Sequence, residues 1–354
     1  MCEAGKELSA AARGGWGARA SVWVSGRALR LLALALCGLH VVLVLCHYPL
    51  AAVWSEHPLV GGDLTLHFAP AHLGWELRNA GGRLLWGYLP QFMAGYPFGA
   101  WDSFTQRGYE YCTLLFPGLS VAGAFNAYVI LSALLPPFLV GLAARALRLE
   151  SATVWLSLAA AVVVYQAGGM LTFFWTFGNV GFPLVNALAV LYLACAWRAV
   201  DECRAGYAAA AGLLLAAVGW LHQMAALPAA AGSLLLAAAQ GRALFRGRRL
   251  LYALAIPVLA LALLAPWLGV LWRFRHWRVP RETPALRSGW RHLVMDLFSD
   301  RGYRQHFDRR TLFQAQLVLT ALGAWGAADG ARRTVRWLAA TAAAALAFAY
   351  LFSY

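Results

Sequence analysis

Long apolar runs separated by short polar segments dominate the sequence. Apolar runs of about 20 residues predict membrane helices. We predict spans at about residues 31–54, 119–147, 152–170, 181–199, 250–272, 311–327 and 337–354. The apolar run 206–240 is too long for one span at a rise of about 1.5 Å per residue. We interpret it as two short helices that turn at His222-Gln223, which predicts nine spans, or eight if the run is one long tilted helix.

The pattern therefore predicts an all-α polytopic membrane protein. Residues 1–28 form a basic N-terminal tail, predicted to be cytoplasmic, and residues 29–354 form a single transmembrane bundle. Pro136-Pro137 should break or kink the second span, because proline removes a helical hydrogen bond. The chain ends at the outer end of the last predicted span, which leaves open whether residue 354 is the natural C-terminus.

Two outer loops are predicted, at residues 55–118 and 273–310. In the first, we expect a short helix over Ala69–Ala80, with Pro70 in its first turn and Gly81-Gly82 as its stop. This helix is amphipathic enough to lie on the membrane surface. After it, residues 86–116 read as turns rich in aromatic side chains.

Composition supports the membrane class. Hydrophobic residues make up 61% of the chain and charged residues 12%, against about 25% charged in soluble domains. In a membrane protein, a net charge of +14 is explained by basic residues that set the topology and contact anionic headgroups. Since no basic helix or aromatic RNA-binding pattern is present, nucleic acid is not an expected partner. The six cysteines show neither CxxC pairs nor metal-type spacing, so the sequence supports no disulfide framework and no zinc site.

The positive charges are divided unevenly. Of 29 Lys and Arg residues, 16 lie in the predicted cytoplasmic segments and 13 in outer ones, as the positive-inside rule requires of short loops. Ten of those 13 lie in the loop 273–310, which violates the rule. Arginine binds phosphate through paired N–H groups, so a lipid-linked phosphate is one explanation. Attraction to the headgroups of membrane lipids is the other.

The first outer loop carries the candidate chemistry. Asp63 follows Gly61-Gly62, and its carboxylate could activate a hydroxyl or bind a divalent metal. The alternative is an N-cap for a helix that starts near Leu64. If residues 63–67 are helical, His67 shares a face with Asp63 and can orient it or contact a substrate.

Further candidates lie along the same loop and beyond it. Asp102 and Glu110 are possible second carboxylates, with a turn residue or a solvated charge as the alternative. Tyr96 and Trp101 belong to an aromatic stretch that suits stacking on sugar rings or isoprenoid chains, or a membrane-interface belt. His222 lies where polar groups usually face a cavity, with a satisfied turn contact as the alternative.

The first loop resembles that of the GT-C superfamily of membrane glycosyltransferases, in particular its poorly characterised bacterial members. The matching residues are Pro58-Leu59-Val60-Gly61-Gly62-Asp63-Leu64-Thr65-Leu66-His67 and Leu89-Pro90-Gln91-Phe92-Met93-Ala94-Gly95-Tyr96-Pro97. The sequence departs from better-known members because no Asp-Glu or Asp-x-Asp pair follows the first span.

The resemblance implies a function. Such enzymes take a sugar from a polyprenyl-phosphate-linked donor and transfer it on the outer face of the bacterial inner membrane. Asp63 would be the catalytic base or a ligand of Mg²⁺ or Mn²⁺, and Asp102 the second acidic position. The loop 273–310, including Arg273, Arg275, Arg278 and Arg281, would hold the donor phosphate. The alternative is a non-catalytic membrane protein, either a transporter with a broken helix at Pro136-Pro137 or a lipid-binding or structural subunit.

Overall fold

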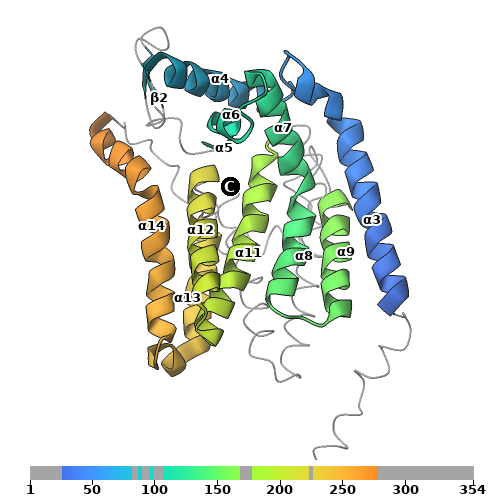
Figure 1. Cartoon of the computed structure of the whole chain (residues 1–354), viewed down its shortest axis with the longest axis vertical. Helices are drawn as coiled ribbons and strands as arrows, with labels where there is room; N and C mark the ends of the chain where they lie inside the picture. Colours follow the sequence, from blue (N-terminus) through green and yellow to red (C-terminus); the bar gives the residue numbers. More distant parts are fainter. Residues whose placement is uncertain are drawn as a thin grey trace, which may run out of the picture.

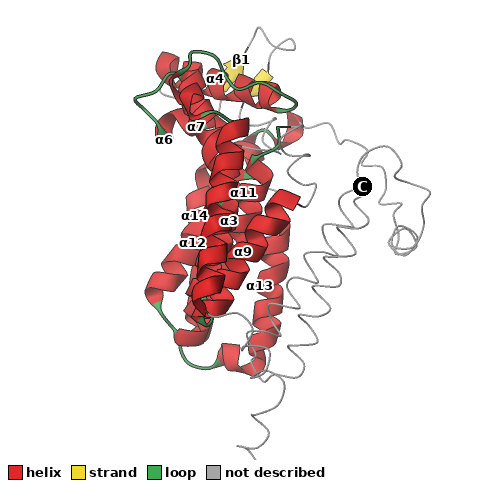
Figure 2. Cartoon of the chain, turned by 90° about the vertical axis from the view of Figure 1, so that its right-hand side faces the viewer, coloured by secondary structure: helices red, strands yellow, loops and turns green. Residues whose placement is uncertain are grey.

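A computed structural model describes residues 26–81, 87–89, 96–98, 107–167, 178–222 and 226–277. The described part is mostly helical, and its long helices lie side by side (Figures 1 and 2). One helix, α4 (Leu64–Gly81), instead lies across one end of the bundle (Figure 1), which we call the α4 end. This end corresponds to the predicted outer side.

The remaining elements, in chain order, are α3 (Gly26–His47), η2 (Leu50–Trp54), β1 (Gly87–Leu89), β2 (Tyr96–Phe98), α5 (Arg107–Glu110), α6 (Cys112–Leu115), α7 (Val121–Leu134), α8 (Pro136–Ala146), α9 (Ser151–Ala167), α11 (Gly181–Glu202), α12 (Ala205–Leu221), α13 (Ala226–Gln240), η4 (Gly241–Phe245), α14 (Arg249–Arg273) and η5 (Arg275–Trp277). The two strands pair antiparallel, with Gly87 opposite Phe98 and Leu89 opposite Tyr96.

Three described helices are long and apolar enough to cross a membrane: α3, α11 and α14. The α7–α8 pair, bent by 52°, makes a fourth candidate if it is one span. Shorter apolar helices occur at Ser151–Gln166, Ala205–Leu221 and Ala229–Phe245. The chain is thus of the polytopic all-α class, and the predicted count of nine spans extends to residues outside the described ranges.

Helix α11 is the centre of the bundle. Its apolar window is 83% buried, against 22% for α3 and for α14, and it packs on α8, α12, α13 and α14. The exposed side chains of α3 and α14 are largely apolar, Leu31 and Leu251 among them. A helix with an exposed apolar face suits contact with lipid, so α3 and α14 form the edges of the bundle.

Small residues bring α12 close to α14. A Cβ atom on Gly212 would lie 2.7 Å from a Leu259 methyl carbon, and one on Gly219 would lie 2.9 Å from a Leu264 methyl carbon. Without a Cβ, the leucines of α14 fill these positions, which is how membrane helices obtain close contact. The glycine spacing of seven residues keeps both on one face of the helix.

The predicted helix break at Pro136-Pro137 is present, and side chains of neighbouring helices form hydrogen bonds at the bend. Helix α7 ends at Leu134, and α8 starts at Pro136 because proline is suited to a first helical turn. His40 Nε2 of α3 donates to the Leu134 carbonyl at 3.0 Å, and Gln166 of α9 donates to His40 Nδ1 at 2.7 Å. Three segments are therefore linked by a fully engaged imidazole at the bend.

Asn126 attaches the segment after α3 to helix α7. Its buried amide nitrogen donates to the carbonyls of Ala52 and His57 at 2.7 and 3.0 Å, and its oxygen accepts from the Leu59 amide at 2.7 Å. One side chain thus satisfies three backbone groups of an irregular segment. This contact sets the direction in which the chain approaches the Asp63 turn.

Several predicted boundaries were wrong. The first helix ends at His47 rather than Trp54, because Pro49 disfavours helix before it and the chain continues as η2. It also begins at Gly26, inside the segment assigned to the tail. The predicted helix Ala69–Ala80 is α4, which begins at Leu64, so that Pro70 lies inside it.

The stretch 86–116, interpreted as turn residues and aromatic side chains, also contains the paired strands β1 and β2 and the helices α5 and α6. Helix α12 ends at Leu221, with His222 in an extended conformation, and α13 begins at Ala226, so two helices are confirmed and the single tilted helix is wrong. The last two predicted spans, 311–327 and 337–354, lie outside the described residues.

Basic segments gather at the end of the bundle opposite α4. The α8–α9 turn, the α11–α12 turn and η4 all lie there (Figure 1). They carry Arg145, Arg148, Arg198, Arg204, Arg242, Arg246, Arg248 and Arg249. We call this the arginine end, and its charge is that expected of a cytoplasmic face.

Candidate functional site

Two glycines shape the turn that presents Asp63. Gly61 and Gly62 have φ values of +144° and +51°, which L side chains rarely adopt. The Asp63 carbonyl then accepts from the His67 amide at 2.9 Å, so Asp63 stands at the N-terminus of α4. Its half-buried carboxylate makes no hydrogen bond or ion pair to any residue of the described ranges. Position therefore agrees with the N-cap interpretation, but the side chain is not used as a cap.

Gly178 supports this turn from the other side. A Cβ on Gly178 would lie 2.6 Å from the Gly61 carbonyl oxygen and 2.6 Å from the Leu64 nitrogen. Its φ of +74° also requires glycine. The segment just before α11 thus packs against the backbone of the Asp63 turn, and a larger residue at position 178 would displace that turn.

His67 lies one helical turn after Asp63 and is buried by α5. Its ring stacks on Tyr109, with 4.6 Å between centroids and 7° between planes. Burial lowers the pKa of His67 to about 4, and its Nε2 has no hydrogen-bond partner among the described residues. At neutral pH this imidazole is uncharged and has a free polar atom.

His222 reaches the same region from α12. Burial, and then the nearby His67, lower the pKa of His222 to about 4. Its ring contacts Phe182 at 5.2 Å, and its Nδ1 has no hydrogen-bond partner in the described ranges. We call Asp63, His67, Tyr109 and His222 the histidine site. The structure thus brings together three residues that the sequence singled out, from the turn before α4, from α4 itself and from the end of α12.

Glu110 is not the solvated charge that one interpretation expected. Its side chain is 5% exposed, and its Oε2 accepts from Arg107 Nε at 2.9 Å and Arg107 Nη2 at 2.8 Å. The Arg107 guanidinium also lies 5.3 to 5.5 Å from three aromatic ring centroids, those of Tyr111, Trp220 and Trp267. This buried ion pair is committed to protein contacts, which favours a structural role for Glu110 over substrate binding.

Arg78 fastens the far half of α4 to α5 and α6. Its Nη1 donates to the Glu110 main-chain carbonyl at 2.9 Å, and its Nη2 donates to the Thr113 hydroxyl. Together with the His67–Tyr109 stack, these bonds hold α4 against the end of the bundle. The histidine site is therefore positioned from both ends of α4.

Arg273 and Arg275 lie at the end of α14 and the start of η5. The Arg273 guanidinium lies 5.9 Å from the ring of Phe274, and that of Arg275 lies 4.0 Å from the ring of Trp272. Arg275 also donates to the Trp272 carbonyl at 2.8 Å from an exposed position. Both arginines thus lie on the α4 end and stack on rings of their own segment.

Other predicted site residues fall outside the described structure. These are Trp101, Asp102, Arg278 and Arg281, while Tyr96 is described only as backbone of β2. The pairing of Asp63 with Asp102 in a metal site therefore stays a prediction. Within the described ranges, no group of three or more His, Cys, Asp or Glu side chains is arranged to hold a metal ion.

Sequence reasoning missed the roles of Arg107, Asn126 and Gly178. The i, i+3 spacing of Arg107 and Glu110 was a usable signal for an ion pair. No local signal marks Asn126 or Gly178, because their partners are distant in the sequence.

The fold and site define a mostly helical protein with several candidate membrane spans and a polar site at one end. No family model, curated protein or solved structure matches the chain.

Proposed function

We propose that the protein is a membrane glycosyltransferase that moves a sugar from a polyprenyl-phosphate-linked donor to an acceptor on the extracytoplasmic face. The resemblance of the first loop to the GT-C superfamily motivates the proposal. The observation that carries it is the Asp63 carboxylate, which has no hydrogen bond or ion pair within the described residues and lies one helical turn before the buried His67.

Asp63 is assigned the role of general base toward the acceptor hydroxyl. A base must have its carboxylate available to the incoming hydroxyl, and a rigid turn must hold it in place. The Gly61-Gly62 turn and its contact with Gly178 supply that rigidity. If a divalent metal takes part, Asp63 and Asp102 are its proposed ligands.

His67 and His222 are assigned to substrate binding. Neutral imidazoles accept hydrogen bonds from sugar hydroxyls, and the unpartnered Nε2 of His67 and Nδ1 of His222 are suited to do so. The donor phosphate is assigned to the arginines that begin at Arg273 and continue along the basic loop, where guanidinium groups would stabilise the leaving phosphate.

The transporter alternative depended on the broken helix at Pro136-Pro137. That break is occupied by the bonds of His40 with Leu134 and Gln166. The Leu134 carbonyl therefore already accepts a hydrogen bond from a side chain, which makes it a weaker candidate ligand for a transported ion or substrate.

The test incubates the full chain in lipid nanodiscs with a panel of polyprenyl-phosphate-linked hexoses and pentoses. Turnover is measured as the rate at which polyprenyl phosphate is released. Asp63→Asn should lower kcat by about 10²-fold or more, as expected for loss of a general base. Glu76→Gln is the matched control, because Glu76 lies on α4, which begins directly after Asp63, is half exposed and pairs with His72 alone among the described residues. It should retain the wild-type rate.

Two results would overturn the proposal. One is an Asp63→Asn variant with wild-type turnover, and the other is a folded wild-type protein that releases no polyprenyl phosphate from any donor of the panel. Circular dichroism of each variant separates lost chemistry from lost folding.

A further inference from the structure

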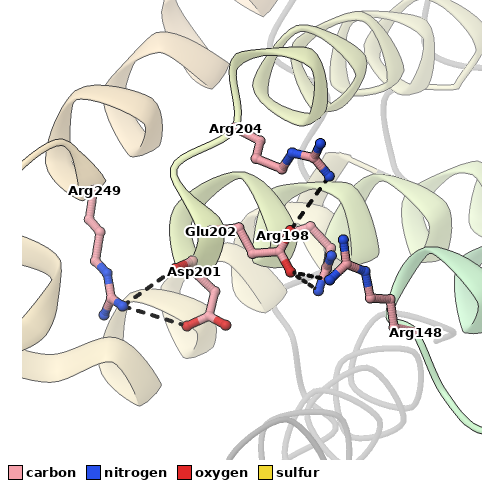
Figure 3. Close-up of polar contacts among 6 residues, drawn as sticks. All are labelled: Arg148, Arg198, Asp201, Glu202, Arg204 and Arg249. Carbon is pink, nitrogen blue, oxygen red and sulfur yellow. Dashed lines mark hydrogen bonds and ion pairs between the residues drawn. The ribbon is translucent and has the colours of Figure 1, made fainter.

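Three arginines from different segments converge on one carboxylate at the arginine end (Figure 3). Arg148 follows α8, Arg198 lies on α11, and Arg204 precedes α12. All three pair with Glu202, near the end of α11, and we call these four residues the Glu202 cluster. Arg249 of α14 pairs separately with Asp201 at 3.8 Å.

The charges of the Glu202 cluster do not balance. One carboxylate for three guanidinium groups leaves a charge of +2. Arg148 lies 3.2 Å from Glu202 Oε1, but Arg204 lies 3.9 Å from Oε2, which is too long for a hydrogen bond. Arg204 therefore contributes charge to the cluster without a hydrogen bond to Glu202.

Arg198 supplies a second and independent observation. Its side chain is 8% exposed, and Nε and Nη2 have no hydrogen-bond partner among the described residues, although another of its nitrogens pairs with Glu202. A buried guanidinium with unused donors is costly, and an anionic acceptor would remove that cost.

Two of these like charges, Arg198 and Arg204, contact the same aromatic ring, that of Tyr207. The guanidinium of Arg198 lies 5.5 Å from the centroid of the Tyr207 ring, and that of Arg204 lies 5.9 Å from it. Cation–π attraction to one ring offsets part of their mutual repulsion. Arg148 and Arg204 are 62% and 58% exposed, so the cluster is open to an anion from outside.

We propose that the Glu202 cluster binds an anionic phosphate group, supplied by the headgroup of a membrane phospholipid. The cluster lies where α11, a candidate membrane span, ends, which is the level of lipid headgroups. Basic pockets between membrane helices on the cytoplasmic side are suited to such headgroups, and guanidinium groups bind phosphate through paired N–H donors. This site is separate from the histidine site at the α4 end.

The test compares phosphatidylglycerol, zwitterionic phosphatidylcholine and inorganic phosphate as ligands of the full chain in uncharged detergent. Native mass spectrometry gives occupancy, and the thermal midpoint gives stabilisation. Wild-type protein should bind phosphatidylglycerol more tightly than phosphatidylcholine. The double variant Arg148→Gln/Arg204→Gln should weaken that binding about 10-fold or more, since it removes two exposed phosphate donors.

The matched control is Arg242→Gln/Arg246→Gln. Both arginines are exposed at the same end, and the control removes the same charge outside the cluster. An equal loss of binding in the two double variants would overturn the proposal, because it would show unspecific attraction to a basic face. Equal binding of the two lipids by the wild type would overturn it as well.

Two further measurements ask whether the ligand is a lipid or free phosphate, and whether Glu202 competes with it for the arginines. If inorganic phosphate stabilises the protein, displaces the lipid and depends on the same two arginines, the phosphate site stands and its ligand is soluble. Glu202→Gln should bind phosphatidylglycerol several-fold more tightly, because the internal competitor for the guanidinium groups is gone. Weaker binding in Glu202→Gln would contradict the assignment.

Discussion

The Arg107–Glu110 pair gives the sharpest test of how the α4 end is held together. We consider two changes: Glu110→Gln alone, and Arg107→Met/Glu110→Leu together. The single change leaves a guanidinium group without its carboxylate at a position where Arg107 is 1% exposed. The double change removes both charges and puts apolar side chains of similar size in their place.

The expected magnitudes follow from burial. Removing one partner of a buried ion pair costs about 3–5 kcal/mol, because the other charge is left without compensation. The three aromatic rings around Arg107 remain in Glu110→Gln and each contribute about 0.5–2 kcal/mol, so we expect the lower end, near 3 kcal/mol, or about 100-fold in the folding equilibrium. Replacement of a whole buried pair by apolar residues is often close to neutral. The double variant should therefore be more stable than the single one.

The assay is equilibrium unfolding in mixed micelles by titration with a denaturing detergent, followed by circular dichroism. Glu76→Gln, at a half-exposed pair on α4, should change stability by less than about 1 kcal/mol. The reasoning fails if Glu110→Gln is as stable as the wild type, or if the double variant is less stable than the single one. Either result would return Glu110 to the list of candidate substrate ligands.

Three further outcomes are expected. Asn126→Leu leaves backbone groups near η2 without partners and should cost about 2–4 kcal/mol, measured in the same titration. Gly108→Ala should lower the thermal midpoint, since its Cβ would clash with the Tyr128 hydroxyl of α7, whereas Gly38→Ala, with no described atom within 4 Å, should be neutral or stabilising. Stability should also depend on pH. The pKa values of His67 and His222 are lowered from 6.5 to about 4, so the unfolded chain binds protons that the folded chain does not. The free energy of unfolding should therefore fall as the pH is lowered from about 6.5 toward 4, by on the order of 3 kcal/mol for each histidine. Above pH 6.5 the full stability is retained. His67→Phe should flatten the pH dependence, and an unchanged slope would contradict the assignment.

The apolar runs were sufficient to predict most of the helices, because a helix in lipid must satisfy its own backbone and be apolar along its length. The break at Pro136-Pro137 and the turn at His222 could also be predicted, since proline removes a donor and a polar pair is costly inside an apolar run. Helix ends were less predictable. Pro70 was taken as a helix start, yet α4 accommodates it internally, because the Gly61-Gly62 turn fixes an earlier beginning.

The site was predictable only in part. Asp63 and His67 are four residues apart, so their common location follows from helical geometry. The arrival of His222 beside His67 depends on how α12 packs against α5 and α11, and no periodicity encodes that contact.

The sequence by itself determined the helical membrane class, the position of the Asp63 turn and the concentration of arginines in short loops, because these depend on residues that are neighbours along the chain. Only the tertiary structure decided that Glu110 is buried with Arg107, that Asn126 fixes the segment after α3 and that three arginines share Glu202. Each of these depends on burial or on a partner in another segment. Burial sets how much a polar group gains from its partner, and it exists only once the helices have packed.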